Sequence, residues 1–291
     1  MGNAVFEPTS AARCSGGVGL VRCVSATVDG VFCVASLVPS PPVLVPELGG
    51  GTGDAEVTRL RAAALRAAAA LAGRATRWIV VGAGETERVI GVNAVGTFRG
   101  YGADVRVGLS GTFQFGGDSN NSVTAVAEAD APADPALPLP VLIAGWLREQ
   151  VAPAAVAEAR LLDGATAPAD CLAFGARLRS ELDAETEPSG VLVVGDGAAT
   201  LSLKAPRYFD ERAEGVQAEI DRALSAGDRQ ALAALDPRLC AELDVAGRPA
   251  HQVLAGLFQA DAADPQVETL YAAAPFGVGY HVSVWRPGGA A

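Results

Sequence analysis

The sequence predicts an α/β fold, a doubly wound and mostly parallel central sheet with helices on both faces. Short and mainly apolar runs such as Val31 to Val38 and Val191 to Val194 are typical of interior parallel strands, which are buried on both faces. These runs alternate along the chain with amphipathic helical patterns, and no clear linker separates them. With 291 residues, half of them apolar, the chain can bury the core of one large domain.

That single domain is predicted to span residues 31–287. Residues 1–30 show no clear periodicity, and they lack the basic start, apolar block and cleavage site of a signal peptide. We expect them to form a poorly structured N-terminal extension, such as an upstream start codon would add, which limited proteolysis should remove. Residues 288–291 are expected to be a short tail.

The first strand must stop at Val38, because proline fixes φ and has no N–H for the sheet, and Pro39-Ser40-Pro41-Pro42 follows. Apolar residues then recur at helical spacing from Glu56 to Ala72, and Gly73 ends this helix. Trp78 to Val81 is predicted to be the next strand, ending in Gly82-Ala83-Gly84.

The remaining elements are predicted from similar signals. Residues 85–135 are rich in Gly, Asn, Ser and Thr and should form strand pieces within a long irregular insertion. The later elements are a helix over Val141 to Val151, the strand Val191 to Val194, a helix capped by Asp210, short helices starting at Asp228 and Asp236, and a final strand over Phe276 to Trp285.

Composition excludes several classes of function. The formal charge of −11 and the pI near 4.7 argue against binding to nucleic acid or to an anionic membrane, both of which require a basic surface. The five cysteines are scattered and form no Cys-x-x-Cys pair, which fits a reducing compartment. No apolar run approaches the length of a membrane span. We therefore expect a cytoplasmic protein.

Glycine-rich strand ends raise the question of nucleotide binding. Gly82-x-Gly84 lacks a third glycine and is followed by Glu85 and Glu87, which would repel a pyrophosphate. Gly195-x-Gly197 is followed by no long helix, and neither motif includes the lysine of a phosphate-binding loop. Turn formation explains these glycines better than phosphate binding.

Few residues could carry chemistry. The chain has two histidines. His281 falls in the predicted final strand, where a structural role in the sheet is favoured over a role as a ligand. His251 falls near a predicted helix start, where a structural role is again favoured. Asp196 is a lone carboxylate at a strand end, where ligands collect in such sheets. It can serve chemistry or cap the following turn, and the sequence does not separate these alternatives.

The strand ends resemble a known family. Pro39-Ser40-Pro41-Pro42 and Val194-Gly195-Asp196-Gly197-Ala198-Ala199 are similar to strand ends of the class III extradiol ring-cleavage dioxygenase superfamily, which includes Memo-like proteins. The resemblance runs from about residue 31 to 285, and it looks closest to an uncharacterised actinobacterial branch. It implies a doubly wound α/β fold with a pocket at the strand ends. In active relatives two histidines and a glutamate hold Fe(II) there.

The iron ligands implied by this resemblance are missing here. The histidine positions fall on Ser40, Gly84 and Ala199, and the late ligand falls near Val245 or Ala246. Serine is a poor ligand for Fe(II), and the other side chains offer no donor. We therefore predict no metal site and no cofactor, although the fold would be that of the family.

Three functions follow as hypotheses. The first is a divergent member of the superfamily that has lost its iron and binds a small molecule or a protein partner. The second is an oxidoreductase or hydrolase with a relocated site at Asp196 and His251, assisted by Ser40 or Glu242. The third is an interaction or scaffolding protein, and a homo-oligomer stays open. The predicted pocket rim consists of Pro39, Ser40, Pro41, Gly84, Gly195, Gly197 and Ala199.

Overall fold

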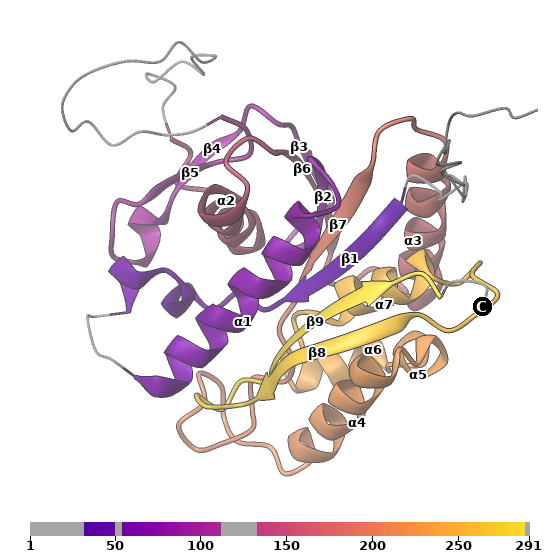
Figure 1. Ribbon diagram of the computed structural model, residues 1–291. Helices are drawn as coiled ribbons and strands as arrows, with labels where there is room; N and C mark the ends of the chain where they lie inside the picture. The colour runs from indigo at the N-terminus through magenta and orange to yellow at the C-terminus, as the bar shows by residue number, and fades with distance from the viewer. Residues whose placement is uncertain (1–31, 50–53, 112–132, 289–291) are drawn as a thin grey trace, which may run out of the picture.

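Figure 1 shows the computed structural model, which describes residues 32–49, 54–111 and 133–288. The predicted N-terminal extension lies outside the described residues. So do residues 289–291 of the predicted tail and residues 112–132 of the predicted insertion.

A seven-stranded mixed sheet forms the centre, in the order β3-β6-β2-β7-β1-β9-β8. Its strands are β1 (Phe32–Val38), β2 (Arg77–Gly84), β3 (Arg88–Ile90), β6 (Val156–Asp163), β7 (Ser189–Val194), β8 (Gln266–Ala273) and β9 (Tyr280–Arg286). The central strands β6, β2, β7 and β1 pair in parallel, whereas β3, β9 and β8 pair antiparallel with their neighbours. The prediction of an α/β protein is confirmed, and the parallel pairing is confined to the middle of the sheet.

Helices connect and cover these strands (Figure 1). They are α1 (Ala55–Ala72), α2 (Leu139–Val151), α3 (Pro168–Asp183), α4 (Ala213–Ala226), α5 (Arg229–Ala233), α6 (Pro237–Glu242) and α7 (Arg248–Leu257). Short 3-10 turns are η1 (Pro42–Leu44), η2 (Pro46–Leu48) and η3 (Phe98–Tyr101). A separate two-stranded sheet pairs β4 (Val95–Thr97) with β5 (Arg106–Gly108).

The side chains of β1 alternate between two hydrophobic clusters. Val34 and Val38 belong to a cluster with residues of α1 and α2. Ala35 and Leu37 belong to a second cluster, which includes residues of α3, α4, α5, α6 and α7. This alternation follows from the two-residue period of a strand, and it explains why both faces of β1 are mainly apolar; the buried Ser36 hydroxyl donates to the carbonyl of Ala67.

Several boundaries differ from the sequence-based predictions, and β2 runs to Gly84, beyond the predicted Trp78 to Val81. Asp210 does not cap α4, which begins at Ala213 after Arg212; instead its carboxylate accepts a hydrogen bond from the backbone N–H of Arg212 and closes a turn before the helix. The final strand starts at Tyr280 and not at Phe276, because Gly277 adopts φ 75° in a turn. The predicted starts after Asp228 and Asp236 are confirmed, as both carboxylates accept helix N–H groups.

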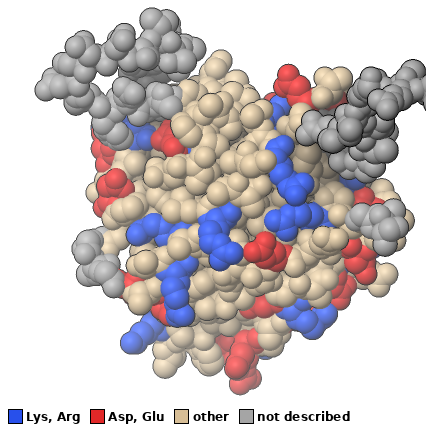
Figure 2. Space-filling model, viewed as in Figure 1, with Lys and Arg blue, Asp and Glu red and all other residues tan. Residues whose placement is uncertain are grey.

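The acidic charge of the chain is unevenly distributed. Basic side chains gather over the band where α1 crosses the face in view (Figure 2), and α1 contains Arg59, Arg61 and Arg66. Arg59 pairs with Glu56 and Arg66 with Glu268, so acidic neighbours balance part of this charge. Among the described residues, no helix has the length and apolar character needed to cross a membrane.

Candidate functional site

Ser40 and Asp196 meet where two neighbouring strands end. β1 and β7 pair in parallel with Val38 opposite Val194, and the N–H of Gly195 donates to the carbonyl of Val38. The two chain segments therefore leave the sheet at the same level. The Ser40 hydroxyl donates to one carboxylate oxygen of Asp196 at 2.6 Å, and the Ser40 N–H donates to the other at 2.9 Å.

The Asp196 carboxyl lies in a poorly solvated environment. Burial raises its pKa, and the two hydrogen bonds from Ser40 oppose that effect only in part. Tyr280, at the start of β9, lies near this carboxyl. Burial, and then the negative charge of Asp196, raise the pKa of the Tyr280 phenol. Asp196 therefore binds the proline loop across the strand ends, a contact that neither sequence-based alternative for this carboxylate included.

His251 lies in α7 and is buried, with 1% of its surface exposed. Neither ring nitrogen has a hydrogen-bond partner within the described part of the chain. Burial lowers the pKa of His251 to about 4, and the nearby His281 contributes further. The structure therefore holds this imidazole neutral near pH 7 and brings it into no hydrogen bond with Ser40 or Asp196.

The backbones of Gly195, Asp196 and Gly247 lie close together beside His251. The N–H of Gly247, just before α7, donates to the carbonyl of Asp196 at 2.8 Å. A Cβ on Gly195 would lie 2.9 Å from the Cα of Gly247 and 3.3 Å from Nε2 of His251. Glycine is required here so that the two loops can touch, and His251 packs behind this contact.

Sequence reasoning missed a carboxylate partner of the second histidine. Nδ1 of His281, in β9, lies 3.1 Å from a carboxylate oxygen of Asp221 in α4. His281 is in the sheet as predicted, but its Nε2 is buried without a partner among the described residues. No spacing signal could have joined Asp221 to a residue 60 positions away.

The other predicted rim residues have different surroundings. Pro39, Pro41, Gly195 and Gly197 are buried, as is Ala199, which belongs to the cluster with α1 and α2. Gly84 alone among the predicted rim residues lines a large cavity.

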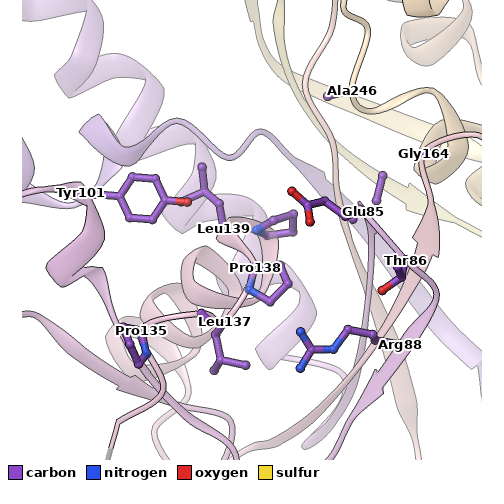
Figure 3. A pocket seen from close by; sticks show the side chains of 14 residues that line it. Glu85, Thr86, Arg88, Tyr101, Pro135, Leu137, Pro138, Leu139, Gly164 and Ala246 are labelled. Carbon is purple, nitrogen blue, oxygen red and sulfur yellow. The ribbon is translucent and has the colours of Figure 1, made fainter.

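That cavity, about 560 Å³ in volume, lies beside the carboxyl ends of β2 and β6 (Figure 3). Gly84 pairs with Asp163 at the end of β6, and the N–H of Gly164 donates to the carbonyl of Gly84. The wall includes the turn after β2, Tyr101, the segment 135–140 that leads into α2, and Ala246 before α7. The size is within the range of small-molecule sites.

The lining of this cavity combines apolar and polar groups. Prolines and leucines of 135–140 form much of one wall, while Glu85, Thr86 and Arg88 come from the opposite turn. In Figure 3 the guanidinium of Arg88 and the hydroxyl of Tyr101 point toward the cavity from opposite sides. Such a mixed lining suits a ligand with an apolar body and a polar end.

The residues matched to the family's iron ligands do not fit a metal. The hydroxyl of Ser40 is engaged by Asp196, Gly84 brings no side chain, and Ala199 and Val245 are packed in hydrophobic clusters. Across the described ranges, no group of three or more His, Cys, Asp or Glu side chains could hold a metal ion. The donor set is therefore wrong for Fe(II).

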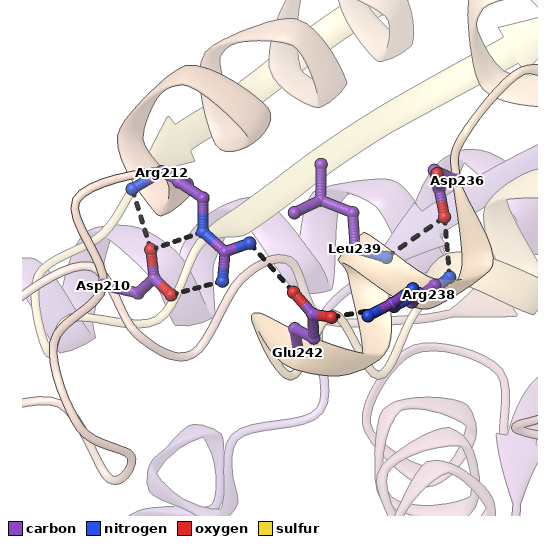
Figure 4. Close-up of polar contacts among 6 residues, drawn as sticks. All are labelled: Asp210, Arg212, Asp236, Arg238, Leu239 and Glu242. Carbon is purple, nitrogen blue, oxygen red and sulfur yellow. Dashed lines mark hydrogen bonds and ion pairs between the residues drawn. The ribbon is translucent and has the colours of Figure 1, made fainter.

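Glu242, a further candidate from the sequence, is committed elsewhere. Its carboxylate pairs with Arg212 at 2.8 Å and with Arg238 at 3.1 Å, and Arg212 also binds Asp210 (Figure 4). The hydrogen bonds from Arg212 and then Arg238 lower the pKa of Glu242. This surface network ties α6 to the start of α4, and it gives Glu242 no role beside Asp196.

Comparison with known proteins gives little further information. No family model matches the chain, and no curated protein matches it. Among solved structures it is similar to the uncharacterized protein JW3007 from Escherichia coli K12, with 15% sequence identity and a TM-score of 0.48. The similarity covers 87% of this chain and 99% of that one.

Proposed function

We propose that this protein is a divergent relative of the class III extradiol dioxygenases, doubly wound as that family implies, which binds a small molecule without iron. The observation that supports the proposal is the cavity of about 560 Å³ at the strand ends. It lies where ligands collect in α/β sheets, and its wall includes Gly84 and Ala246, two of the positions matched to metal ligands. Neither position has a metal-donor side chain. This edge of the sheet could therefore bind a small molecule but not the family's metal.

The test compares two exposed alanines. Ala246→Trp places an indole in the cavity, whereas Ala62→Trp, on the exposed side of α1, places one outside it. We expect small molecules that bind the parent protein, detected by ligand-observed NMR, to lose binding in Ala246→Trp and to keep it in Ala62→Trp. Equal binding to all three proteins would exclude the cavity as the site.

Metal analysis provides a second, independent test. Protein purified aerobically and anaerobically should contain iron well below one atom per chain. Stoichiometric iron together with O₂ uptake on a catechol would overturn the proposal.

An enzyme with a relocated site is the second candidate, favoured by the partly buried Asp196 carboxyl and its raised pKa beside the Ser40 hydroxyl. Its test is a panel of oxidoreductase and hydrolase substrates. A reaction that is lost in both Asp196→Ala and His251→Ala, while both variants remain folded, would favour the enzyme over a protein that only binds its ligand. The lack of a hydrogen bond between these side chains makes this the weaker candidate.

A further inference from the structure

The side chain of Arg88, at the start of β3, points into the cavity and has no ion-pair or hydrogen-bond partner in the described part of the chain (Figure 3). Most of the other arginines of the described residues pair with a carboxylate or a carbonyl, as Arg61, Arg148 and Arg248 do. Arg88 is exposed at the wall of this partly apolar cavity, and a guanidinium without a partner can form paired hydrogen bonds with a carboxylate.

We propose that the cavity binds small carboxylates with an apolar body, with Arg88 as the residue that receives the carboxylate. This inference rests on the proposed function of the cavity. The prolines and leucines of 135–140 would contact the apolar body, and the Tyr101 hydroxyl faces the cavity from the other side. The guanidinium fork can donate two parallel hydrogen bonds to one carboxylate, which a neutral amide cannot match.

Glu85 sets a limit on the charge of the ligand. Its carboxylate also lines the cavity, and like Arg88 it has no partner among the residues that the structure describes. A second negative group on the ligand would share the cavity with Glu85, and like charges repel. The site should therefore prefer monocarboxylates to dicarboxylates.

The start of α2 adds a smaller contribution. Pro138 is its N-cap and makes no side-chain cap hydrogen bond, and Leu139 and Pro140 line the cavity. The partial positive charge of a helix N-terminus favours anions, but it is weak at exposed sites. Arg88 and the cavity carry the inference without it.

Matched pairs of compounds test this inference. Hexanoate and hexanamide, and phenylacetate and phenylacetamide, have the same shapes and differ in charge, while adipate adds a second carboxylate to the hexanoate skeleton. We expect each monocarboxylate to bind the parent protein about tenfold more tightly than its amide, and adipate to bind more weakly than hexanoate. Titration calorimetry or NMR titration measures these affinities at low salt, where an exposed arginine is least screened.

Two arginine variants show whether Arg88 is responsible. Arg88→Gln should lower the affinity for hexanoate about tenfold and leave the affinity for hexanamide unchanged. Arg74→Gln is the matched control, because Arg74 is also exposed and lies outside the cavity. Both positions are at the surface, so unchanged melting temperatures should show that both variants fold.

The possible failures are distinguishable. If amides bind as tightly as carboxylates and Arg88→Gln binds like the parent, the carboxylate inference is wrong while the cavity remains a ligand site. If no compound of either kind binds the parent, or if Ala246→Trp binds them all equally, the proposed function fails and this inference fails with it.

Discussion

The contact between Ser40 and Asp196 gives the proline loop a fixed position. The rigid prolines reduce the number of loop conformations, but the two hydrogen bonds to Asp196 select the one in which the loop lies against the end of β7. A serine at this place therefore has a structural reason to be present. In the folded chain its hydroxyl is the partner of a carboxylate.

Replacement of this serine should be measurable as a loss of stability. We expect Ser40→Ala to lower the free energy of unfolding by about 1–2 kcal/mol, because the Asp196 carboxylate loses a 2.6 Å hydrogen bond in a poorly solvated site. Urea unfolding at pH 7 measures the change. Ser180→Ala is the control, since Ser180 is exposed and its hydroxyl bonds only within α3. Equal stability of Ser40→Ala and the parent would contradict the prediction.

His251 makes stability depend on pH. Its pKa of about 4 in the folded protein lies below the ordinary value of 6.5, so the unfolded chain binds a proton that the folded chain excludes. The contribution of the neutral form is complete above pH 6.5 and is lost as the pH falls toward 4. Asp196, whose pKa is raised, acts with the opposite sign.

A histidine variant isolates this effect. Between pH 7 and pH 5 the parent should lose about 2 kcal/mol more unfolding free energy than His251→Leu, in which Asp196 and the other acids titrate as before. Unfolding curves at both pH values measure the difference. Parallel loss in both proteins would show that His251 is protonated in the folded state or is not the group responsible.

At the scale of elements, the backbones of helices α3 and α7 lie close together because each helix has a glycine at the contact. A Cβ on Gly175 in α3, or on Gly256 in α7, would lie under 3.0 Å from backbone atoms of the facing helix. These residues are unfavourable for helix propensity, and close packing of the two backbones is the compensating gain. The sequence-based predictions do not include α3, whose buried side is made only of Cys171, Gly175, Leu178 and Leu182 and so gives a weak apolar pattern.

Matched glycine substitutions should therefore have opposite effects. Gly175→Ala should lower the unfolding free energy by about 1–3 kcal/mol through overpacking, even though alanine is the better helix former. Gly215→Ala in α4, where a Cβ would contact nothing, should be neutral or raise it by up to about 1 kcal/mol. Thermal and urea unfolding of the two variants check the difference, and a neutral Gly175→Ala would refute the packing explanation.

The strands missed from the sequence share one property. β6 contains Glu158 and Arg160, and β8 contains the exposed Glu268, so neither has the continuous apolar run that identified β1 and β7. Both lie nearer the sheet edges, where one side or both can meet water. Local hydrophobicity identified the buried strands and failed for the half-exposed ones.

At the scale of the whole molecule, stability should decrease from the centre of the sheet to its edges. All residues of β7 are buried, and it lies between β2 and β1, whereas β8 is an edge strand with mostly exposed residues. In native-state hydrogen exchange, β7 amides should exchange only by global unfolding, and β8 amides by smaller openings. Equal protection of the two strands, measured by NMR or mass spectrometry under the same conditions, would contradict this order.

The candidate site was only partly accessible to sequence reasoning. Asp196 and Gly84 were both placed at strand ends, and each is there, but the first contacts Ser40 and the second lines a separate cavity. Arg88 and Tyr101 were not singled out, because a lone arginine and a lone tyrosine after a strand resemble any surface residues. Only their common position at the cavity distinguishes them.

The sequence by itself determined several of the buried strands and the proline loop that ends the first of them. These properties depend on side-chain chemistry and on short-range periodicity, which a linear chain displays. The tertiary structure alone decided the strand order, the contact of Ser40 with Asp196, the burial of His251 behind Gly195, and the cavity beside Gly84. These features depend on which distant segments pack together, and that packing is decided by the burial of apolar surface over the whole core.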